Sequence, residues 1–595
     1  MKKYLSILLV LIMSFIIFTG FKTDNTKKIN IAMQYGMQYA PVYVMRELGL
    51  LQKKLPDVEI TFSNLGGGSS MSEALITNQV DMAFMGIPPA IIAWDKGADF
   101  KIVTGICVPP SELMVKENSG INSLQDFKPE DKIAVPSIGS IQHIMLVSAS
   151  EKLFGDAHKF DNQIVPMSNP DAFATLTNNT GITSHMASMP YIDKEQETGH
   201  KSILSAEEAF GKASIVGVST TNFTESEYFD IILKTLQETV TLINNKDDEA
   251  IRIISEKEQI TKEKALEYVS WEGTQYSTEI YGVKELAEVM NKFEYITKTA
   301  DDTNELLQIK STEMLAKTQL NYVLLLFMVI GCVICGVKCK KIKALKYIVY
   351  ILVVAIIWEI TVMLQIFPEM LFPSIIDIFK SLITELFTGE LLVKISYSLK
   401  LIFIGMGVSI IISILLLIAS FVMPFTKDII KTLISVLDPL PGVAILPLAI
   451  LWVGIGEGAI IFIMIHSIVW PMVAYTLNGF STIPTIYEDI GASIGLSKFK
   501  MLKDIYFFSA MPSIFQGIKT GWSRAWRALI SAEMVFGATG TIGGLGWDLY
   551  IKRNFFNTSG MFATLLVIML IGILVENLLF SRIEKSTLVK WGMVK

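Results

Sequence analysis

Cysteine and histidine are scarce in this chain of 595 residues, which has four of the first and five of the second. Cys107 stands alone in the first half, whereas Cys332, Cys335 and Cys339 fall in or beside one apolar run that offers no histidine or carboxylate partner. Metal sites and disulfide frameworks need several such side chains at suitable spacing. We therefore expect no metal, disulfide or cofactor, and no nucleophile–base pair supports a membrane-bound enzyme.

A nucleotide-binding segment is also missing. No stretch matches G-x-x-x-x-G-K-[ST], and the run Gly-Leu-Ser-Lys-Phe-Lys at 495–500 does not fit it. Any hydrolysis of ATP must then come from a separate subunit. The net charge of −6 is small and spread along the chain, which gives no indication of nucleic-acid binding.

Apolar residues, in contrast, are abundant: they make up 51% of the chain, and the mean hydropathy is +0.47. This composition is too apolar for a soluble enzyme and fits a protein with a soluble part and a membrane part. The first residues, Met1-Lys2-Lys3 followed by an apolar stretch to Gly20, are typical of a secretory signal. We interpret residues 1–22 as a signal sequence or a signal anchor that directs the next domain outward.

Residues 28–305 read as a soluble domain. Short strand-like apolar runs at 29–33, 58–62, 81–85, 100–105 and 132–135 alternate with helical patterns such as 71–78. Strands that alternate with helices favour parallel α/β units. Sheets of this kind bind ligands at the carboxyl ends of their strands.

The second half reads as a membrane domain. Residues 306–344 form a linker with one apolar span at 320–337, followed at once by five lysines between 338 and 346, which favour a cytoplasmic end. Six further spans, at 346–366, 398–422, 430–454, 458–479, 513–537 and 560–581, place the polar loop 484–512 in the cytoplasm. The same topology places Lys552 and Arg553 on the outer side of the membrane, which conflicts with the rule that basic residues favour the cytoplasmic side.

The loop 484–512 carries the most informative pattern. Asp489, two small residues at Gly491 and Ala492, Gly495 and Ile505, with Pro512 closing the loop, resemble the coupling loop of ABC-importer permeases. The resemblance implies a helix–turn–helix that docks into a cytoplasmic ABC ATPase dimer, and small residues allow close backbone approach. The chain departs from the family pattern at Ile490, a position usually small, and at Phe508, where a proline is usual.

The resemblance covers most of the chain. Residues 345–595 look like the permease of nitrate, sulfonate and taurine importers, with matching stretches at 437–447, 454–457, 525–534 and 543–546. Residues 28–305 are similar to the solute-binding proteins of those importers at 34–41, 66–70, 80–86, 134–140 and 185–191. The implied fold is a two-lobed α/β domain of the periplasmic-binding-protein type II, followed by an all-α polytopic membrane domain. It also implies an ATP-driven importer in which two copies of the permease pair as a homodimer in the cell membrane.

Loops after the predicted strands supply the expected solute site. Its residues are Gln34, Tyr35, Met37, Gln38, Tyr39, Gly68, Ser69, Ser70, Ser137, Gly139, Ser140, Ser188 and Tyr191. Aromatic rings and thioethers suit an organic ligand with an apolar part, and backbone N–H groups at a helix start favour an acidic group. The only arginines in the domain are Arg46 and Arg252, in neither case in such a loop, so a small inorganic anion such as nitrate fits less well than an organic solute. The alternative is a membrane-anchored sensor that binds a solute without transporting it.

Overall fold

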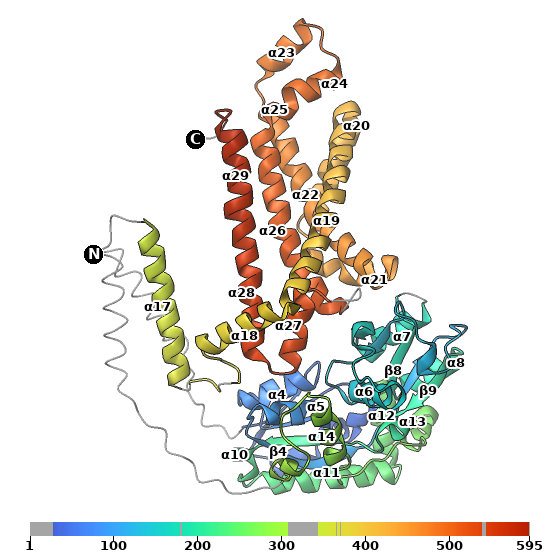
Figure 1. Ribbon diagram of the computed structural model, residues 1–595. Helices are drawn as coiled ribbons and strands as arrows, with labels where there is room; N and C mark the ends of the chain where they lie inside the picture. Colours follow the sequence, from blue (N-terminus) through green and yellow to red (C-terminus); the bar gives the residue numbers. More distant parts are fainter. Residues whose placement is uncertain are drawn as a thin grey trace.

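The computed structural model describes residues 28–178, 181–307, 343–364, 366–368, 370–537 and 543–593. The predicted signal segment and the predicted span at 320–337 lie outside these residues. Figure 1 shows an α/β body at one end of a set of long helices. The two-lobed α/β architecture and the all-helical second half predicted from the sequence are both confirmed.

The first lobe is built on a five-stranded sheet in the order β2-β1-β3-β10-β4. Its strands are β1 (Lys28–Met33), β2 (Glu59–Asn64), β3 (Met82–Gly86), β4 (Phe100–Cys107) and β10 (Ile215–Thr220). β1 pairs in parallel with β2 and β3, whereas β10 runs antiparallel between β3 and β4. The helices of this lobe include α2 (Ala40–Glu47), α4 (Gly68–Ile76), α5 (Ile87–Asp95), α11 (Phe229–Asn244), α12 (Asp248–Glu258) and α14 (Val283–Lys292).

The second lobe repeats this plan with the order β7-β6-β8-β5-β9. Its strands are β5 (Ser111–Val115), β6 (Ile133–Val135), β7 (Ile164–Pro166), β8 (Ser184–Ser188) and β9 (Lys201–Ser205), and its helices include α6 (Ile141–Phe154), α7 (Asn169–Thr177) and α8 (Tyr191–Glu197). β5 is antiparallel to both of its neighbours. The chain passes between the lobes after β4 and again before β10, so the segments at 107–111 and 205–215 form a hinge.

All five sequence-predicted strands are present within two residues of their expected ends, and the predicted helix at 71–78 is α4. The parallel pattern expected throughout is interrupted by β10 and β5. Each of these strands enters a sheet directly after a crossing between the lobes. Their direction is therefore set by the path of the chain through the hinge, which apolar alternation does not encode.

The second half is helical. Its helices are α17 (Lys343–Met363), α18 (Ile375–Thr388), α19 (Glu390–Val422), α20 (Pro424–Leu437), α21 (Leu446–Val453), α22 (Glu457–Ser481), α26 (Met511–Phe536), α27 (Leu545–Asn554) and α28 (Thr558–Leu574). Among the described residues, α19, α22 and the helical run Thr558–Val589 are long and apolar enough to cross a membrane. The predicted span at 513–537 is the helix α26, but its charged side chains keep it outside that group.

The predicted span at 430–454 is not one straight helix. The helical segments Phe425–Leu437 and Gly442–Ile450 meet at a bend of 95°. Pro439 and Pro441 lie in the break, and proline removes a backbone donor and clashes with the preceding turn of a helix. This region is therefore a broken span or a re-entrant loop.

Figure 1 also shows how the two halves are arranged. The helices α23 (Thr485–Ser493) and α24 (Lys498–Met501) lie at the end of the long helices farthest from the α/β body. The short helices α18 and α27 lie at the opposite end, and α27 rests on the α/β body. The predicted coupling loop and the predicted solute domain are thus at opposite ends of one helical bundle.

Candidate functional site

A cleft of about 800 Å³ lies between the two lobes. It is bounded by the loops after β1, β2 and β3 on one side and by the segments around the starts of α6, α7 and α8 on the other. Nine of the sequence-predicted residues line it: Gln34, Tyr35, Gln38, Tyr39, Gly68, Ser137, Ser140, Ser188 and Tyr191. The carboxyl ends of strands from both sheets therefore meet here, as the sheet rule predicts.

Four other predicted residues do not line the cleft. Met37 is 2% exposed and packs in the core near Cys107, and Gly139 lies behind the start of α6 against Ile92. Ser69 and Ser70 follow Gly68 in the first turn of α4, where the helix turns their side chains away from the cleft. Loop position alone did not distinguish these residues from their neighbours.

The start of α4 brings backbone donors to the cleft. Gly67 and Gly68 begin the helix without a side-chain cap, so the first N–H groups of α4 have no hydroxyl or carboxylate acceptor of their own. A Cβ at Gly68 would lie 2.3 Å from Cγ of Pro89, which explains why glycine is needed there. At the start of α6, in contrast, Oγ of Ser140 accepts a hydrogen bond from the N–H of His143 at 3.2 Å.

Charged side chains that the loop argument missed also line the cleft: Arg46, Lys194, Lys257 and Glu258. They lie on α2, α8 and α12, which are helices and not the loops that follow strands. Arg46 and Lys257 both pair with Glu47. No carboxylate of the described residues lies within ion-pair distance of Lys194, whose Nζ sits 5.2 Å from the centre of the Tyr191 ring.

Glu258 is the acidic group of the cleft wall. The Tyr43 hydroxyl donates to its Oε1 at 3.2 Å. Burial raises the pKa of Glu258 to about 7, against the opposing effects of the Tyr43 hydrogen bond and the nearby charge of Lys194. The wall at this point changes charge close to neutral pH.

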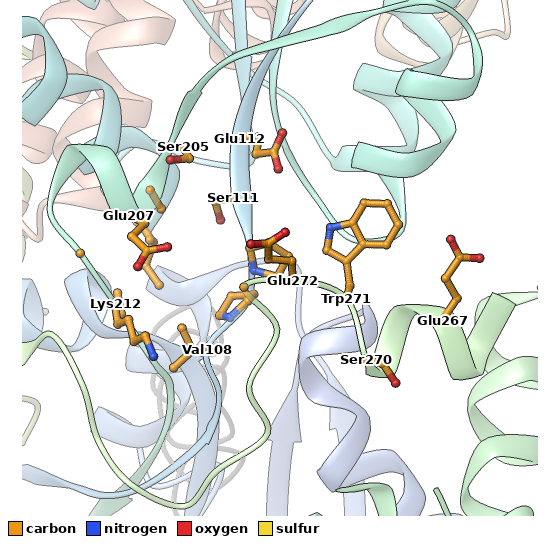
Figure 2. Close-up of a pocket in the computed structure, with 17 residues that line it drawn as sticks. Val108, Ser111, Glu112, Ser205, Glu207, Lys212, Glu267, Ser270, Trp271 and Glu272 are labelled. Carbon is orange, nitrogen blue, oxygen red and sulfur yellow. The ribbon is translucent and has the colours of Figure 1, made fainter.

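A second hollow, of about 700 Å³, lies at the hinge crossings and shares Pro109, Ser111 and Ile141 with the cleft. Figure 2 shows the indole of Trp271 beside it, with the carboxylates of Glu112, Glu207 and Glu272 around the same opening. Because its walls come from both hinge segments, its shape depends on how far the lobes have closed.

The predicted coupling loop is a helix–turn–helix. α23 ends before Gly495, whose φ of +73° is a left-handed conformation that favours glycine, and α24 follows the turn. Gly491 is buried, and a Cβ there would lie 2.8 Å from Cδ1 of Ile505. The Gly491–Ile505 contact therefore closes the two arms of the loop on each other, whereas Gly495 shapes the turn.

The outer surface of this loop carries a group of exposed apolar side chains. Asp489 and Ala492 are exposed, and so are large side chains around them: Ile486, Tyr487, Ile490, Ile494 and Phe499. Pro512 starts α26 behind the loop. An exposed apolar patch on a defined helix–turn–helix is typical of a surface that another protein covers.

The helical half contacts the α/β body mainly through α27 and the residues after it. Arg553 holds Glu73 of α4 with two hydrogen bonds of 3.0 and 2.9 Å. Ser69 donates to Oδ1 of Asn554 at 2.9 Å, so this predicted solute residue contacts the helical half. The ring of Phe555 stacks on Tyr295 at 5.3 Å.

Comparison with known proteins agrees with this division. Residues 37–194 match the family described as NMT1/THI5 like, and residues 409–589 match the binding-protein-dependent transport system inner membrane component. The chain thus has one segment that is similar to each of these two families. The resemblance drawn from the sequence, a solute-binding domain joined to an importer permease, is confirmed. After the families that they resemble, residues 28–307 are from here on called the receptor half and residues 343–593 the permease half.

Similar curated proteins are permeases. The nitrate import permease protein NrtB of Synechocystis sp. is 29% identical over 184 residues, 31% of this chain and 66% of the relative. The taurine transport system permease protein TauC of Escherichia coli is 28% identical over 26% of this chain and 54% of its own length. The putative aliphatic sulfonates transport permease protein SsuC of Bacillus subtilis is 26% identical over 40% of this chain and 84% of the relative. The chain spans between half and two thirds of the first relatives it matches.

Among solved structures, the periplasmic aliphatic sulphonate binding protein SsuA from Escherichia coli aligns with 50% of this chain and 99% of its own, at 20% identity and a TM-score of 0.40.

A buried carboxylate explains one glycine-rich stretch of the permease half. Glu533 on α26 accepts hydrogen bonds from Oγ of Ser398 at 2.7 Å and from the N–H of Gly546 at 2.8 Å. A Cβ at Gly544 would lie 2.1 Å from Oε1 of Glu533. The glycines at 543–546 therefore let the chain turn closely around this carboxylate. Arg524, earlier on the same helix, pairs with Asp438.

Proposed function

We propose that this chain is both the solute receptor and the transmembrane permease of an ATP-driven importer. Residues 28–305 form the extracytoplasmic receptor, residues 306–344 a linker with one transmembrane helix, and residues 345–595 a six-helix permease with the coupling loop at 484–512. Residues 1–22 are the signal sequence or anchor. The observation that carries the proposal is the position of the cleft and the coupling loop at opposite ends of one helical bundle.

The solute is a small organic acid, either a sulfonate of the taurine type or an aromatic or heterocyclic acid. The cleft is large enough for such a molecule, and its tyrosine rings offer flat apolar surface. The free N–H groups of α4 and the side chain of Lys194 favour an acidic group. Relatives named for taurine and for aliphatic sulfonates fit this class, whereas a relative named for nitrate does not.

Two further components complete the importer. The exposed apolar surface of the coupling loop is the docking site of a cytoplasmic ATPase dimer, which supplies the hydrolysis of ATP. A second copy of this chain provides the other half of the permease. The assembly lies in the cell membrane with its receptors outside.

Thermal unfolding of the full chain in detergent tests the receptor role. A panel of sulfonates, aromatic carboxylates, pyrimidines, flavins and nitrate is added, each in large excess. A ligand at 100 times its dissociation constant stabilises its receptor by about 2.7 kcal/mol. We expect a rise in melting temperature with organic acids, and a larger effect of nitrate than of any organic candidate would contradict the solute class.

A further inference from the structure

A histidine and a glutamate are buried together beneath the cleft wall of the second lobe. Nδ1 of His185, on β8, lies 2.6 Å from Oε1 of Glu195, on α8, and both side chains are 0% exposed. Both residues lie outside the set of side chains that line the cleft. A pair so completely removed from water is costly unless its charges compensate each other.

The pair reaches the cleft through Asn169. Nε2 of His185 lies 3.1 Å from Oδ1 of Asn169, and Nδ2 of Asn169 donates to Oγ of Ser188 at 3.0 Å. Asn169 and Ser188 both line the cleft. A chain of hydrogen bonds therefore runs from Glu195 through His185 and Asn169 to the solute space.

The orientation of the Asn169 amide fixes one proton of this chain. Nδ2 of Asn169 donates to Ser188, so Oδ1 is the atom that faces Nε2 of His185. An amide oxygen only accepts hydrogen bonds. In this orientation Nε2 of His185 therefore carries a proton and donates to Oδ1 of Asn169.

The other titratable groups beside Glu195 in the chain have partners of their own. His200 accepts a hydrogen bond from the N–H of Glu117 at its Nδ1, 3.1 Å away, and burial lowers its pKa. On α8, Asp193 is paired with Lys264. Of these groups, His185 is the one that is hydrogen-bonded to the carboxyl group of Glu195.

This arrangement makes one face of the cleft a surface of hydrogen-bond donors. With Oδ1 turned toward His185, the amide group of Asn169 presents N–H, and Ser188, which accepts one of these, keeps its hydroxyl hydrogen to donate. Lys194 lines the same wall and is a donor only. We propose that His185 positions Asn169 so that Asn169, Ser188 and Lys194 together bind the oxyanion of an organic acid, a sulfonate or a carboxylate. This inference rests on the proposed function of the cleft as the solute site.

The protonation of His185 is measured directly by nitrogen-15 solid-state NMR of the full chain in lipid, with labelled histidine. The signal of His185 is identified by its loss in His185→Gln, or, if that variant does not fold, by removing the other four histidines singly. We expect Nε2 to give the shift of a protonated ring nitrogen at pH 7. An unprotonated Nε2 would turn the amide of Asn169 over and overturn the inference.

Binding is compared with benzenesulfonate, benzoate and the neutral benzenesulfonamide, using the thermal shift of the full chain. Asn169→Asp replaces the N–H donors with a carboxylate, and we expect it to weaken binding of the acids on the order of tenfold to a hundredfold. Asn178→Asp makes the same change at the other end of α7 and should leave binding unchanged. Comparison of benzenesulfonate with benzoate distinguishes a sulfonate site from a carboxylate site. Binding of the neutral benzenesulfonamide as tightly as the acids would contradict a wall of hydrogen-bond donors that binds an oxyanion.

Two double variants separate positioning from packing. His185→Gln with Glu195→Gln keeps a neutral pair whose amide can donate to Asn169, and it should bind the acids within about threefold of the wild type. His185→Met with Glu195→Gln fills the space without a donor and should lose binding as Asn169→Asp does. Equal binding by both would contradict the role of His185. If the wild type binds none of the probes, the proposed solute site fails, and the Nε2 signal still decides whether His185 holds Asn169.

Discussion

Arg553 of the permease half and Glu73 of the receptor half form a two-point ion pair, with Nε to Oε1 at 3.0 Å and Nη2 to Oε2 at 2.9 Å. Glu73 lies on α4, the helix whose first turn opens into the solute cleft. The pair therefore ties the permease half to one of the helices that line the cleft of the receptor half.

Reversal of either charge should weaken this docking. Because the side chains are 46% and 31% exposed, the pair is worth no more than about 1 kcal/mol, and the repulsion after reversal is of similar size. We expect Arg553→Glu or Glu73→Arg to lower solute-stimulated ATP hydrolysis about fivefold to tenfold, and the double reversal to restore most of it. Arg252→Glu, on the exposed face of α12, is the matched control. If the double reversal does not restore ATP hydrolysis, Arg553 and Glu73 do not influence it as an ion pair.

Gly495→Arg should abolish transport and leave solute binding intact. A side chain at φ +73° costs about 1–2 kcal/mol, and arginine would also stand in the exposed turn of the proposed docking surface. Gly389→Ala introduces similar strain at φ +82° between α18 and α19, far from the loop, and should retain transport. ATP-dependent uptake and the thermal shift with solute measure the two properties separately. Full transport by Gly495→Arg would remove the coupling role of this loop.

Gly491→Leu tests the inside of the same loop. Its Cβ would meet Ile505 at 2.8 Å, so the two arms must separate and the outer apolar surface must change shape. We expect solute-stimulated ATP hydrolysis to fall at least tenfold. Combination with Ile505→Ala, which opens the space, should recover part of the activity, whereas no recovery would place the defect elsewhere.

Tyr191→Ala and Ser70→Ala distinguish residues that the sequence argument treated alike. Tyr191 lines the cleft, and loss of its ring removes apolar contact with a bound organic solute, so affinity should fall about tenfold. Ser70 lies outside the cleft lining, and its substitution should change affinity less than twofold. Titration of the thermal shift gives both values, and the reverse order would mean that the solute lies elsewhere.

Stability should fall as the pH rises toward 7 because of Glu258. Burial raises its pKa from 4.5 to about 7, so the folded receptor holds this proton at pH values where the unfolded chain has lost it. The native state is then favoured below about pH 4.5 and loses this contribution, on the order of 3 kcal/mol, as the pH passes through about 7. The melting temperature of Glu258→Gln, measured against the wild type from pH 4 to 8, should lack this fall. If the melting temperatures of the two proteins change with pH in parallel, the role of Glu258 is contradicted.

The sequence was sufficient for the elements that repeat a local pattern. Strand positions and the order of helices follow from apolar periodicity and glycine placement, whereas the coupling loop was identified by its resemblance to importer permeases. Nine cleft residues were predicted because they follow strands, and the sheet rule brings such loops together.

Contacts between distant segments could not be predicted from the sequence in the same way. Lys552 and Arg553 seemed to violate the charge rule, but Lys552 is buried in ion pairs with Asp548 and Glu385, and Arg553 binds Glu73. Ser69 was assigned to the solute and instead contacts Asn554. Apart from the local Lys552–Asp548 pair within α27, each of these pairings joins segments far apart in the chain, and no single-sequence pattern encodes it.

The most direct test of the account is ATP-dependent uptake into proteoliposomes that contain this chain and its ATPase and no separate binding protein. The solute is an organic acid identified by the thermal shift. We predict uptake that requires ATP and the receptor half of the same chain, and that stops with Gly495→Arg. Uptake only after a separate binding protein is added, or solute binding without any ATP-dependent uptake, would contradict the central claim that one chain both captures and conducts the solute.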